Sequence, residues 1–498
     1  MESKLVLDGR VCLLSHLGIK FYLVKPPLPI PVVDLFAGPG GLGEGFSRVD
    51  DGDGNKVFKS IISIEKDPHA INTLRLRAFY RSWVRSGRAL PDVYLKVLSA
   101  ESKNEKAKAF AKLKKLKEWK DAIHEALRIT LGIRNRAKIC KIIGQRLAGE
   151  RTWVLIGGPP CQAYSLVGRS RMQNHEGLKH DHRHFLYKEY LAIIKKSEPA
   201  IFVMENVKGL NTAKVAGKPI LPAILNDLRV AGSIGYELHS LGAGSPHLAD
   251  DFLIKAEKHG VPQTRHRVII VGVRRDLEIT PKALVRKNIV TVAKAIGDLP
   301  LLKGLATTKK RKEYSITEKG QQYVRADGLR ECLPKSLRDF LFPLSSQLHD
   351  ALLNHQARSH MKEDLERYAW WAAEAKKTGK SPTLHDNVPK ALLPKHQNVH
   401  DDSPMVFADR FKVQLADKPS GTVTSHISKD GHYYIHYDPA QARSFSVREA
   451  ARIQTFPDDY FFMGNRTQQY HQVGNAVPPY LAYQIGIRIA GALAILAR

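Results

Sequence analysis

A cysteine held in a rigid turn is the residue of this sequence best suited to covalent chemistry. Cys161 follows Gly157-Gly-Pro-Pro160, which itself follows the apolar run Trp153–Ile156. Two prolines and two glycines fix the backbone of this turn, which lies at the carboxyl end of a predicted strand, where open α/β sheets bind ligands. A thiolate favoured by nearby positive charge is a good nucleophile. We therefore predict that Cys161 is a nucleophile, with a purely structural cysteine as the alternative.

A carboxyl group and two arginines are predicted to reach the same edge of the sheet. Glu205 follows the apolar strand Ile201–Val203, and a carboxyl group in such surroundings is suited to the role of a general acid. Arg265 and Arg267 come directly before the apolar run Val268–Val273. Because residues alternate along an extended chain, the two arginines face opposite ways. One can point into the site while the other binds backbone or phosphate; the alternative is that both are surface arginines.

A glycine-rich turn predicts a nucleotide-like ligand at this edge. The segment Asp34-Leu-Phe-Ala-Gly-Pro-Gly-Gly-Leu-Gly43 ends a predicted strand and opens a helix. Glycines let a ligand approach the backbone, and a helix N-terminus offers free N–H groups. Gly38, Gly40 and Gly43 also satisfy G-x-G-x-x-G, the dinucleotide fingerprint, so this turn alone leaves NAD open. Glu65, at the end of the next strand, is placed to bind ribose hydroxyl groups.

Runs of β-branched residues alternate with helical patterns in the first half of the sequence. This alternation predicts an α/β fold with a largely parallel sheet, whose strands and helices would position these residues. The strands are predicted at Pro31–Phe36, Ser60–Glu65, Thr152–Ile156, Ala200–Glu205, Tyr236–Ser240 and Arg267–Val273. The helices are predicted at Leu42–Arg48, Pro68–Tyr80, Phe185–Lys196 and Leu221–Val230. Between Glu101 and Glu150, 14 Lys and Arg stand against 6 Asp and Glu in a helical pattern. This stretch predicts a helical insertion at the sheet's edge, either a solvated basic helix pair or a nucleic-acid contact surface.

The alternation is lost near residue 275, which predicts more than one domain. The predicted parts are an N-terminal segment (1–30), a sheet domain (31–274, with the insertion at 101–150), a smaller irregular or β-rich domain (275–440), and a C-terminal part that returns to the sheet domain (441–498). One amphipathic helix is expected near Lys362–Ala373, and a last helix is expected from about Pro478.

The composition bounds the partners and the compartment. The 498 residues carry 78 Lys and Arg against 49 Asp and Glu, a net charge of +29, which favours nucleic acid or an acidic membrane surface as partner. The other cysteines, Cys12, Cys140 and Cys332, form no C-x-x-C pair with each other or with Cys161, which excludes a disulfide framework and a cysteine zinc site. No run approaches the roughly 18 apolar residues of a membrane span. We expect a soluble cytoplasmic protein without a bound metal.

Taken together and in order, the motifs resemble those of the cytosine-5 DNA methyltransferase family. D-L-F-A-G-x-G-G (34–41) is similar to that family's S-adenosylmethionine loop, and G-P-P-C-Q (158–162) to its nucleophile motif. E-N-V (205–207) and Q-x-R-x-R (263–267) are similar to its acid and arginine motifs. Residues 443–458 resemble the motif that joins two domains, and Gln472-Val-Gly-Asn-Ala-Val-Pro-Pro479 resembles the closing motif that returns to the cofactor pocket. The resemblance spans Val32 to Ala482 and implies a Rossmann-like, S-adenosylmethionine-dependent methyltransferase sheet.

The resemblance also implies a role for each candidate residue. Cys161 would attack carbon 6 of a cytosine flipped out of the duplex, Glu205 would contact N3 and the exocyclic amine, and Arg267, supported by Arg265, would orient the base. The residues implied to bind S-adenosyl-L-methionine are Phe36, Gly38, Gly40, Gly41, Glu65, Pro160, Asn475 and Val477. The residues expected to contact DNA are Gln162, Ser165, Arg169, Thr422, Thr424 and Lys429.

Two segments are expected to close on DNA. Leu166–His184 resembles the family's mobile loop, with an ordinary surface loop as the alternative. Residues 275–440 stand where the family keeps its target-recognition domain, and Lys418–Gly431 is the best candidate there for reading bases, with a plain β-hairpin as the alternative. The family also has an acidic motif after its third strand that contacts the adenine amine. The basic insertion occupies that neighbourhood, and Asp92 is only a weak candidate for it.

The leading interpretation is therefore a DNA cytosine-5 methyltransferase that acts on double-stranded DNA. A transfer-RNA cytosine-5 methyltransferase of the same fold and a DNA-binding protein that has lost catalysis are the alternatives. The chain resembles stand-alone modification enzymes, such as those paired with a cognate restriction endonuclease, and we expect a monomer.

Overall fold

The computed structural model describes residues 29–100, 102–160, 186–215, 217–242, 249–306, 333–349, 351–394 and 408–497. Within the first 28 residues it gives the backbone of an antiparallel sheet of β1 (Lys4–Leu7), β2 (Arg10–Ser15) and β3 (Gly18–Leu23). Four predicted site residues, Cys161, Gln162, Ser165 and Arg169, lie outside the described residues, as does the loop Leu166–His184.

A central sheet carries the motifs, and its strand order is β11-β13-β8-β7-β4-β5-β6, with β12 paired to β13. Its strands are β4 (Ile30–Leu35), β5 (Phe58–Glu65), β6 (Ala126–Arg128), β7 (Val154–Gly157), β8 (Ile201–Val207), β11 (Tyr236–His239), β12 (Leu253–Lys255) and β13 (His266–Arg274). The five strands from β8 to β6 are parallel, as predicted, whereas β11, β12 and β13 pair in antiparallel fashion at one side. The chain runs outward from β4 to β6 and then returns to β7 on the other side of β4. This reversal creates a crevice between the ends of β4 and β7, which is the usual ligand position in open α/β sheets.

Helices cover both faces of the sheet. On one face lie α6 (Ile133–Leu147), α8 (Leu186–Ser197) and α9 (Leu221–Arg229), and on the other lie α1 (Gly41–Ser47) and α16 (Pro479–Leu493). The strands serve both faces by alternation, because Val154 and Ile156 of β7 join the α1–α16 side while Leu155 joins the opposite side.

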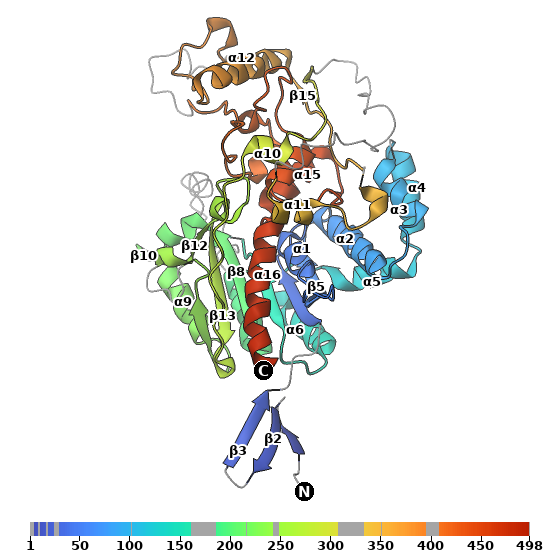
Figure 1. Cartoon of the computed structure of the whole chain (residues 1–498), viewed down its shortest axis with the longest axis vertical. Helices are drawn as coiled ribbons and strands as arrows, with labels where there is room; N and C mark the ends of the chain where they lie inside the picture. Colours follow the sequence, from blue (N-terminus) through green and yellow to red (C-terminus); the bar gives the residue numbers. More distant parts are fainter. Residues whose placement is uncertain are drawn as a thin grey trace.

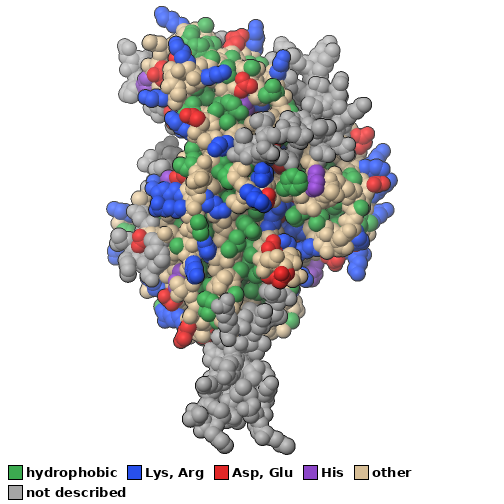
Figure 2. Space-filling model, in the orientation of Figure 1, with side chains coloured by type: hydrophobic (Ala, Val, Ile, Leu, Met, Phe, Trp, Pro, Cys, Tyr) green, Lys and Arg blue, Asp and Glu red, His purple; other side chains and the backbone are tan. Residues whose placement is uncertain are grey.

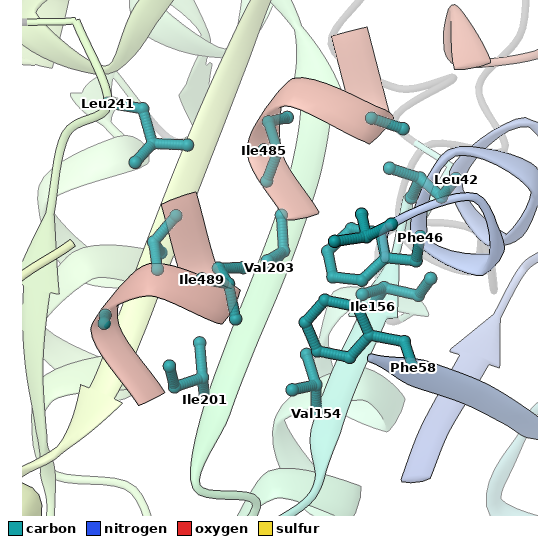
Figure 3. Packing of buried hydrophobic residues seen from close by; sticks show 14 of the residues in the cluster. Leu42, Phe46, Phe58, Val154, Ile156, Ile201, Val203, Leu241, Ile485 and Ile489 are labelled. Carbon is teal, nitrogen blue, oxygen red and sulfur yellow. The ribbon is translucent and has the colours of Figure 1, made fainter. Parts of the chain in front are cut away.

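The core beneath α1 and α16 holds α1, the helix that follows the glycine-rich turn, in place. Figure 3 shows Leu42 and Phe46 of α1 and Ile485 and Ile489 of α16 packed over strands of the central sheet. Phe46 also lies 5.1 Å, centroid to centroid, from the ring of Phe58 in β5. Burying a side chain of this size contributes about 1.5–3 kcal/mol. Helix α16 runs beside α1 (Figure 1), so the end of the sequence stabilises the first glycine turn.

The basic insertion is helical, as predicted, but it also contains a strand. Helices α4 (Lys103–Leu113) and α5 (Lys117–Glu125) follow α2 (Ala70–Arg85) and α3 (Asp92–Ser99). They share an aromatic core in which Phe79 stacks on Tyr94 and lies 6.4 Å from Trp119. The chain then forms β6, which pairs with β5 at the edge of the sheet, and α6 leads back to β7.

Beyond β13 the described chain is largely irregular. The sequence predicted an irregular or β-rich domain here, and the described part of it is irregular rather than β-rich. The elements there are α10 (Val292–Ile296), β14 (Leu305–Ala306), α11 (Lys335–Leu341), β15 (Ser359–His360), α12 (Lys362–Thr378), α14 (Val447–Ile453) and α15 (Arg466–Asn475). The expected helix near Lys362–Ala373 is α12. Helix α11 packs against the sheet side of the molecule, where Phe340 contacts Tyr480 and its carbonyl accepts a hydrogen bond from Arg48. The predicted domain boundaries stay a prediction.

By length and composition, the helical stretch Arg466–Leu496 is the one stretch within the described chain that could cross a membrane. In the most apolar 18 residues of this stretch, 61% is buried inside the molecule. Helix α16, which belongs to the stretch, supplies core residues that pack on the sheet. Its apolar character is explained by this packing.

Candidate active site

The candidate site lies where β4, β5, β7 and β8 end. The glycine turn follows β4, Glu65 ends β5, the Gly-Pro-Pro turn follows β7, and Glu205 stands near the end of β8. Because these strands are parallel, their carboxyl ends meet at one edge, as the sequence predicted.

The glycine turn adopts left-handed backbone geometry that its sequence permits. Gly38 has φ +57° and Gly40 has φ +97°, and Phe36, despite its side chain, has φ +57°. A Cβ atom on Gly38 would meet nothing within 4 Å, so open space lies in front of the turn. A Cβ atom on Gly41 would overlap the carbonyl oxygen of Val477. Gly38 therefore leaves room for a ligand, and Gly41 allows the closing motif to pack against the turn.

Glu65 is held by the backbone of both neighbouring turns. Its Oε2 accepts a hydrogen bond from the Gly38 N–H at 2.8 Å, and its Oε1 accepts from the N–H groups of Lys66 at 2.7 Å and Asp67 at 2.8 Å. Three donors thus orient this carboxylate beside the glycine turn. The position fits the predicted role of binding hydroxyl groups of a ribose.

Asp34 is a buried carboxyl group that the sequence reasoning did not single out. It is fully buried in β4, and neither carboxylate oxygen has a hydrogen bond of ordinary geometry within the described residues. Burial raises the pKa of Asp34 to about 8 against the opposing effect of the Gly43 N–H, and the negative charge of Glu65 adds to the rise. The sequence pattern that could have indicated this buried carboxyl group is an aspartate inside the apolar run Val32-Val-Asp-Leu-Phe36.

Glu205 and Arg267 form an ion pair at the end of β8. Arg267 Nε lies 2.9 Å from Glu205 Oε1, and each side chain is only 13% exposed. Antiparallel pairing of β8 with β13 sets Arg267 opposite Val207 and Ile269 opposite Glu205. Arg267 and Glu205 are therefore diagonal neighbours on the same face of the sheet. Burial lowers the pKa of Arg267, and the carboxylate of Glu205 opposes this effect. A cation beside a carboxylate can fix the orientation of that carboxylate toward a substrate.

The end of β8 also holds the turn that leads to Cys161. Asn206 Nδ2 donates a hydrogen bond to the Pro159 carbonyl at 3.3 Å. A Cβ atom on Gly158 would lie 2.9 Å from Glu205 Oε2, so the missing side chain lets the turn approach the carboxylate. Pro160 is half-buried directly before Cys161. The E-N-V and G-P-P motifs are therefore brought together as the sequence predicted.

Arg265 faces away from this pair, which confirms that the two arginines point in opposite directions. Its guanidinium is buried and donates to the carbonyl groups of Val423 at 2.7 Å and Gly474 at 3.5 Å. Burial lowers the pKa of Arg265 well below its usual range. Arg265 thus joins the segment 418–431 to the segment 472–479 instead of contacting Glu205.

The segment 418–431 is not a β-hairpin. Ser420 forms a bridge with Gln263, and a 3₁₀ turn at Ser425–Ser428 follows. The Thr422 hydroxyl donates to the Thr264 carbonyl at 2.6 Å, and the Thr424 hydroxyl lies 3.2 Å from the Tyr434 hydroxyl. Both threonines thus lie near Arg265.

Two further predicted residues are exposed. Lys429 stands on the exposed turn after the 3₁₀ segment. Asn475 ends α15 with its amide nitrogen 3.2 Å from His471 Nδ1. Val477, two residues further, carries the carbonyl that meets Gly41.

A buried charge cluster beneath the glycine turn was also missed. Glu44 accepts hydrogen bonds from Arg48 at 2.9 Å and from Arg77 at 2.6 Å, and Arg77 also lies 2.9 Å from Asp459. The Tyr460 hydroxyl, one residue on, donates to the Pro39 carbonyl in the turn itself. Arg77 and Asp459 are 382 positions apart, and Tyr460 and Pro39 are 421 positions apart, so no local sequence pattern indicates these two contacts.

Comparison with known proteins agrees with this geometry. Residues 115–491 match the family described as C-5 cytosine-specific DNA methylase. A type II methyltransferase from Bacillus paralicheniformis is 34% identical over 469 residues, which cover 91% of this chain and 96% of that protein. A DNA (cytosine-5-)-methyltransferase from Aeropyrum pernix is 26% identical over 416 residues, which cover 71% of this chain and 84% of that protein.

Among solved structures, a protein described as a DNA modification methyltransferase of an E. coli prophage has the same fold. It shares 21% sequence identity with a TM-score of 0.56, covering 93% of this chain and 99% of that one. The expected methyltransferase sheet is thereby confirmed. Of the three interpretations offered by the sequence, the one in which DNA is methylated is confirmed. The chain belongs to the C-5 cytosine-specific DNA methylase family and is a DNA (cytosine-5-)-methyltransferase.

Proposed function

We propose that Cys161 is the nucleophile of this methyltransferase, that Glu205 is its proton donor and that Arg267 orients the target cytosine. The observation that carries the proposal is the Glu205–Arg267 ion pair of 2.9 Å, which adjoins the Gly-Pro-Pro turn before Cys161. Arg265 acts as a positioning residue through its contacts with Val423 and Gly474.

The chemistry requires each of these groups. Carbon 5 of cytosine is a poor nucleophile in the intact ring. The Glu205 carboxylate first takes up a proton from solvent. A bond from the Cys161 sulfur to carbon 6, with transfer of this proton from Glu205 to N3, then gives an enamine whose carbon 5 is nucleophilic. Once carbon 5 carries the methyl group, a solvent base removes its proton, the carbon–sulfur bond breaks, and N3 returns its proton to Glu205. The products are 5-methylcytosine, the thioether left from the methyl donor, and the free thiolate of Cys161.

The methyl donor of the family is S-adenosylmethionine, which supplies an electrophilic methyl group when bound. The edge of the sheet fits such a donor, because Gly38 faces open space and three backbone donors orient Glu65. The residues proposed to hold it are Phe36, Gly38, Gly40, Gly41, Glu65, Pro160, Asn475 and Val477. Gly41 and Val477 act through their close contact, which fixes the shape of the turn.

The partner proposed is double-stranded DNA within a restriction–modification system, because the B. paralicheniformis relative is a type II methyltransferase. Contacts to the target are assigned to Gln162, Ser165, Arg169, Thr422, Thr424 and Lys429. The proposal includes a cognate restriction endonuclease of the same specificity, a monomeric enzyme and a cytoplasmic location.

The decisive experiment measures transfer of labelled methyl groups from S-adenosylmethionine to unmethylated genomic DNA and, separately, to bulk transfer RNA. The wild type and Cys161→Ser are compared, followed by nucleoside analysis. We expect 5-methyldeoxycytidine from the wild type and no transfer by the variant, which keeps its affinity for DNA. Near-normal turnover by Cys161→Ser would contradict the mechanism, and label in RNA alone would contradict DNA as the substrate.

A further inference from the structure

The strand order decides which end of the methyl donor meets which strand. From the middle of the sheet to its edge, the order is β7, β4, β5 and β6, with neighbouring strands about 4.8 Å apart. If the donor is bound as proposed above, its methyl group faces Cys161 after β7 and its ribose reaches Glu65 at the end of β5. The purine base is then left on the β6 side.

An arginine stands at that position. Parallel pairing sets Ser63 opposite Ala126 and Glu65 opposite Arg128, so Arg128 is the β6 residue level with the ribose-binding carboxylate. Its side chain is exposed, and its Nε donates a long hydrogen bond of 3.4 Å to the Lys66 carbonyl, one residue beyond Glu65. The guanidinium therefore lies beside the chain that leaves β5.

Strand β6 and the turn after it, which the structure describes in full, contain no carboxylate for the amine of adenine. Asp67, one residue beyond Lys66, accepts hydrogen bonds from the N–H groups of His69 and Ala70 at the start of α2. Residues 126–131 read Ala-Leu-Arg-Ile-Thr-Leu. Glu125, just before β6, is occupied by an ion pair with Arg81. Asp92, the only candidate that the sequence offered for the family's acidic motif, is an exposed residue at the start of α3, a helix that packs in the aromatic core shared with α2 and α5. A second guanidinium, that of Arg75, donates to the Ala126 carbonyl at 3.1 Å, so the edge is rich in donors.

We propose that Arg128 binds the edge of the purine that carries position 6, in place of the carboxylate used by the family. A guanidinium offers only donors, so it can pair with a ring nitrogen of adenine but not with the amine. A 6-oxo purine presents two neighbouring acceptors, N7 and O6, which a guanidinium binds with two hydrogen bonds. The site is therefore one for a purine nucleosyl ligand that tolerates an oxygen at position 6.

Calorimetry with two thioether ligands tests this assignment on the whole enzyme without turnover. The ligands are S-adenosyl-L-homocysteine and its 6-oxo analogue, S-inosyl-L-homocysteine. We expect the wild type to bind both with dissociation constants within about threefold of each other, because Arg128 can serve either base. In Arg128→Asp the carboxylate accepts from the amine and repels O6, so the ratio of the analogue's dissociation constant to that of the adenosyl ligand rises at least about tenfold.

Two further variants complete the test. Arg134→Asp makes the same charge change at an exposed position in the first turn of α6, and we expect it to leave the ratio unchanged. Arg128→Ala serves if the aspartate variant fails to fold, and it should weaken the 6-oxo ligand more than the adenosyl ligand.

The inference fails if the wild type rejects the 6-oxo ligand by more than about tenfold, or if substitution of Arg128 leaves the ratio unchanged. In both cases the proposed function stands as long as S-adenosyl-L-homocysteine binds. If the wild type does not bind that ligand at all, the proposed donor site and this inference fail together.

Discussion

Carboxyl groups beneath the glycine turn are buried in two contrasting ways. Burial alone would raise the pKa of Glu44, but the guanidinium of Arg77, which also donates hydrogen bonds to it, outweighs burial and lowers that pKa. Among the described residues no arginine lies within hydrogen-bond distance of Asp34, and burial raises the pKa of Asp34 to about 8. Near neutral pH the enzyme therefore keeps a largely protonated carboxyl group directly under its ligand turn.

Because Asp34 is protonated in the folded enzyme and ionised in the unfolded chain, this single residue makes the free energy of unfolding depend on pH. The unfolded carboxyl titrates near 3.8 and the folded one near 8, so stability from this group is complete below the lower value and is lost as pH rises toward the higher. In Asp34→Asn nothing titrates there. We expect the free energy of unfolding of the wild type to fall relative to that of the variant by up to about 1.4 kcal/mol per pH unit across this window. Urea denaturation at pH 5, 6, 7 and 8 measures the difference.

Asp53→Asn, at an exposed aspartate in the loop before β5, is the matched control, and its stability should run parallel to that of the wild type. Parallel curves for Asp34→Asn as well would show that Asp34 is ionised in the folded enzyme over this whole range.

At the scale of elements, the loop after α14 fixes the geometry of the glycine turn. Tyr460 in this loop is buried, its hydroxyl donates to the Pro39 carbonyl, and its ring stacks against the Arg77 guanidinium at 4.8 Å. The chain that leaves the motif predicted to join two domains therefore also reaches the glycine turn. Tyr460 would act as a positioning residue, since it holds the turn and does not itself face the open space at Gly38.

Tyr460→Phe removes this hydrogen bond and keeps the ring. We expect the dissociation constant for S-adenosyl-L-homocysteine, measured by calorimetry, to rise about fivefold, which corresponds to the loss of one hydrogen bond of about 1 kcal/mol. Tyr470→Phe is the control, because its hydroxyl also donates to a backbone carbonyl, that of Phe445, in the core shared by α14 and α15. The idea is refuted if both variants bind the ligand equally well.

Elements with strong periodicity and turns with special backbone needs were predictable from the sequence. The strands that end at the glycine turn, at Glu65 and at the Gly-Pro-Pro turn lie within two residues of their predicted positions, because apolar runs and glycines mark them locally. Strand β6 was missed, since its residues Ala126–Arg128 are too few to show a period of two. That one of the two arginines binds backbone was predicted, but its partners, the carbonyl groups of Val423 and Gly474, were not, and the contacts of Asp459 were missed. These contacts depend on segments far apart in sequence, whose approach is set by tertiary packing.

For the whole molecule, we expect the positive charge to govern how strongly the enzyme binds DNA. The chain carries a net charge of +29, and Figure 2 shows Lys and Arg side chains distributed over the face that it presents. Basic residues that neutralise phosphates release counterions, so affinity falls linearly with salt on logarithmic axes, with a slope of about −0.9 for each phosphate contacted.

We expect the affinity for a DNA duplex, measured by fluorescence anisotropy between 50 and 200 mM salt, to fall with a slope of several units on logarithmic axes. Binding of S-adenosyl-L-homocysteine is the internal control, because it displaces few counterions and should change little over the same range. A flat salt dependence for DNA would contradict phosphate contact as a main source of affinity.

The contact between Gly41 and the Val477 carbonyl also bears on how the enzyme is made. The two residues are 436 positions apart, and at a synthesis rate of about 5–20 residues per second the second emerges roughly 20 to 90 s after the first. Throughout that interval the glycine turn lacks the surface that shapes it. The glycine turn therefore reaches its final shape only after Val477 has been made, and we expect chains released by the ribosome before α16 to leave this turn unsupported.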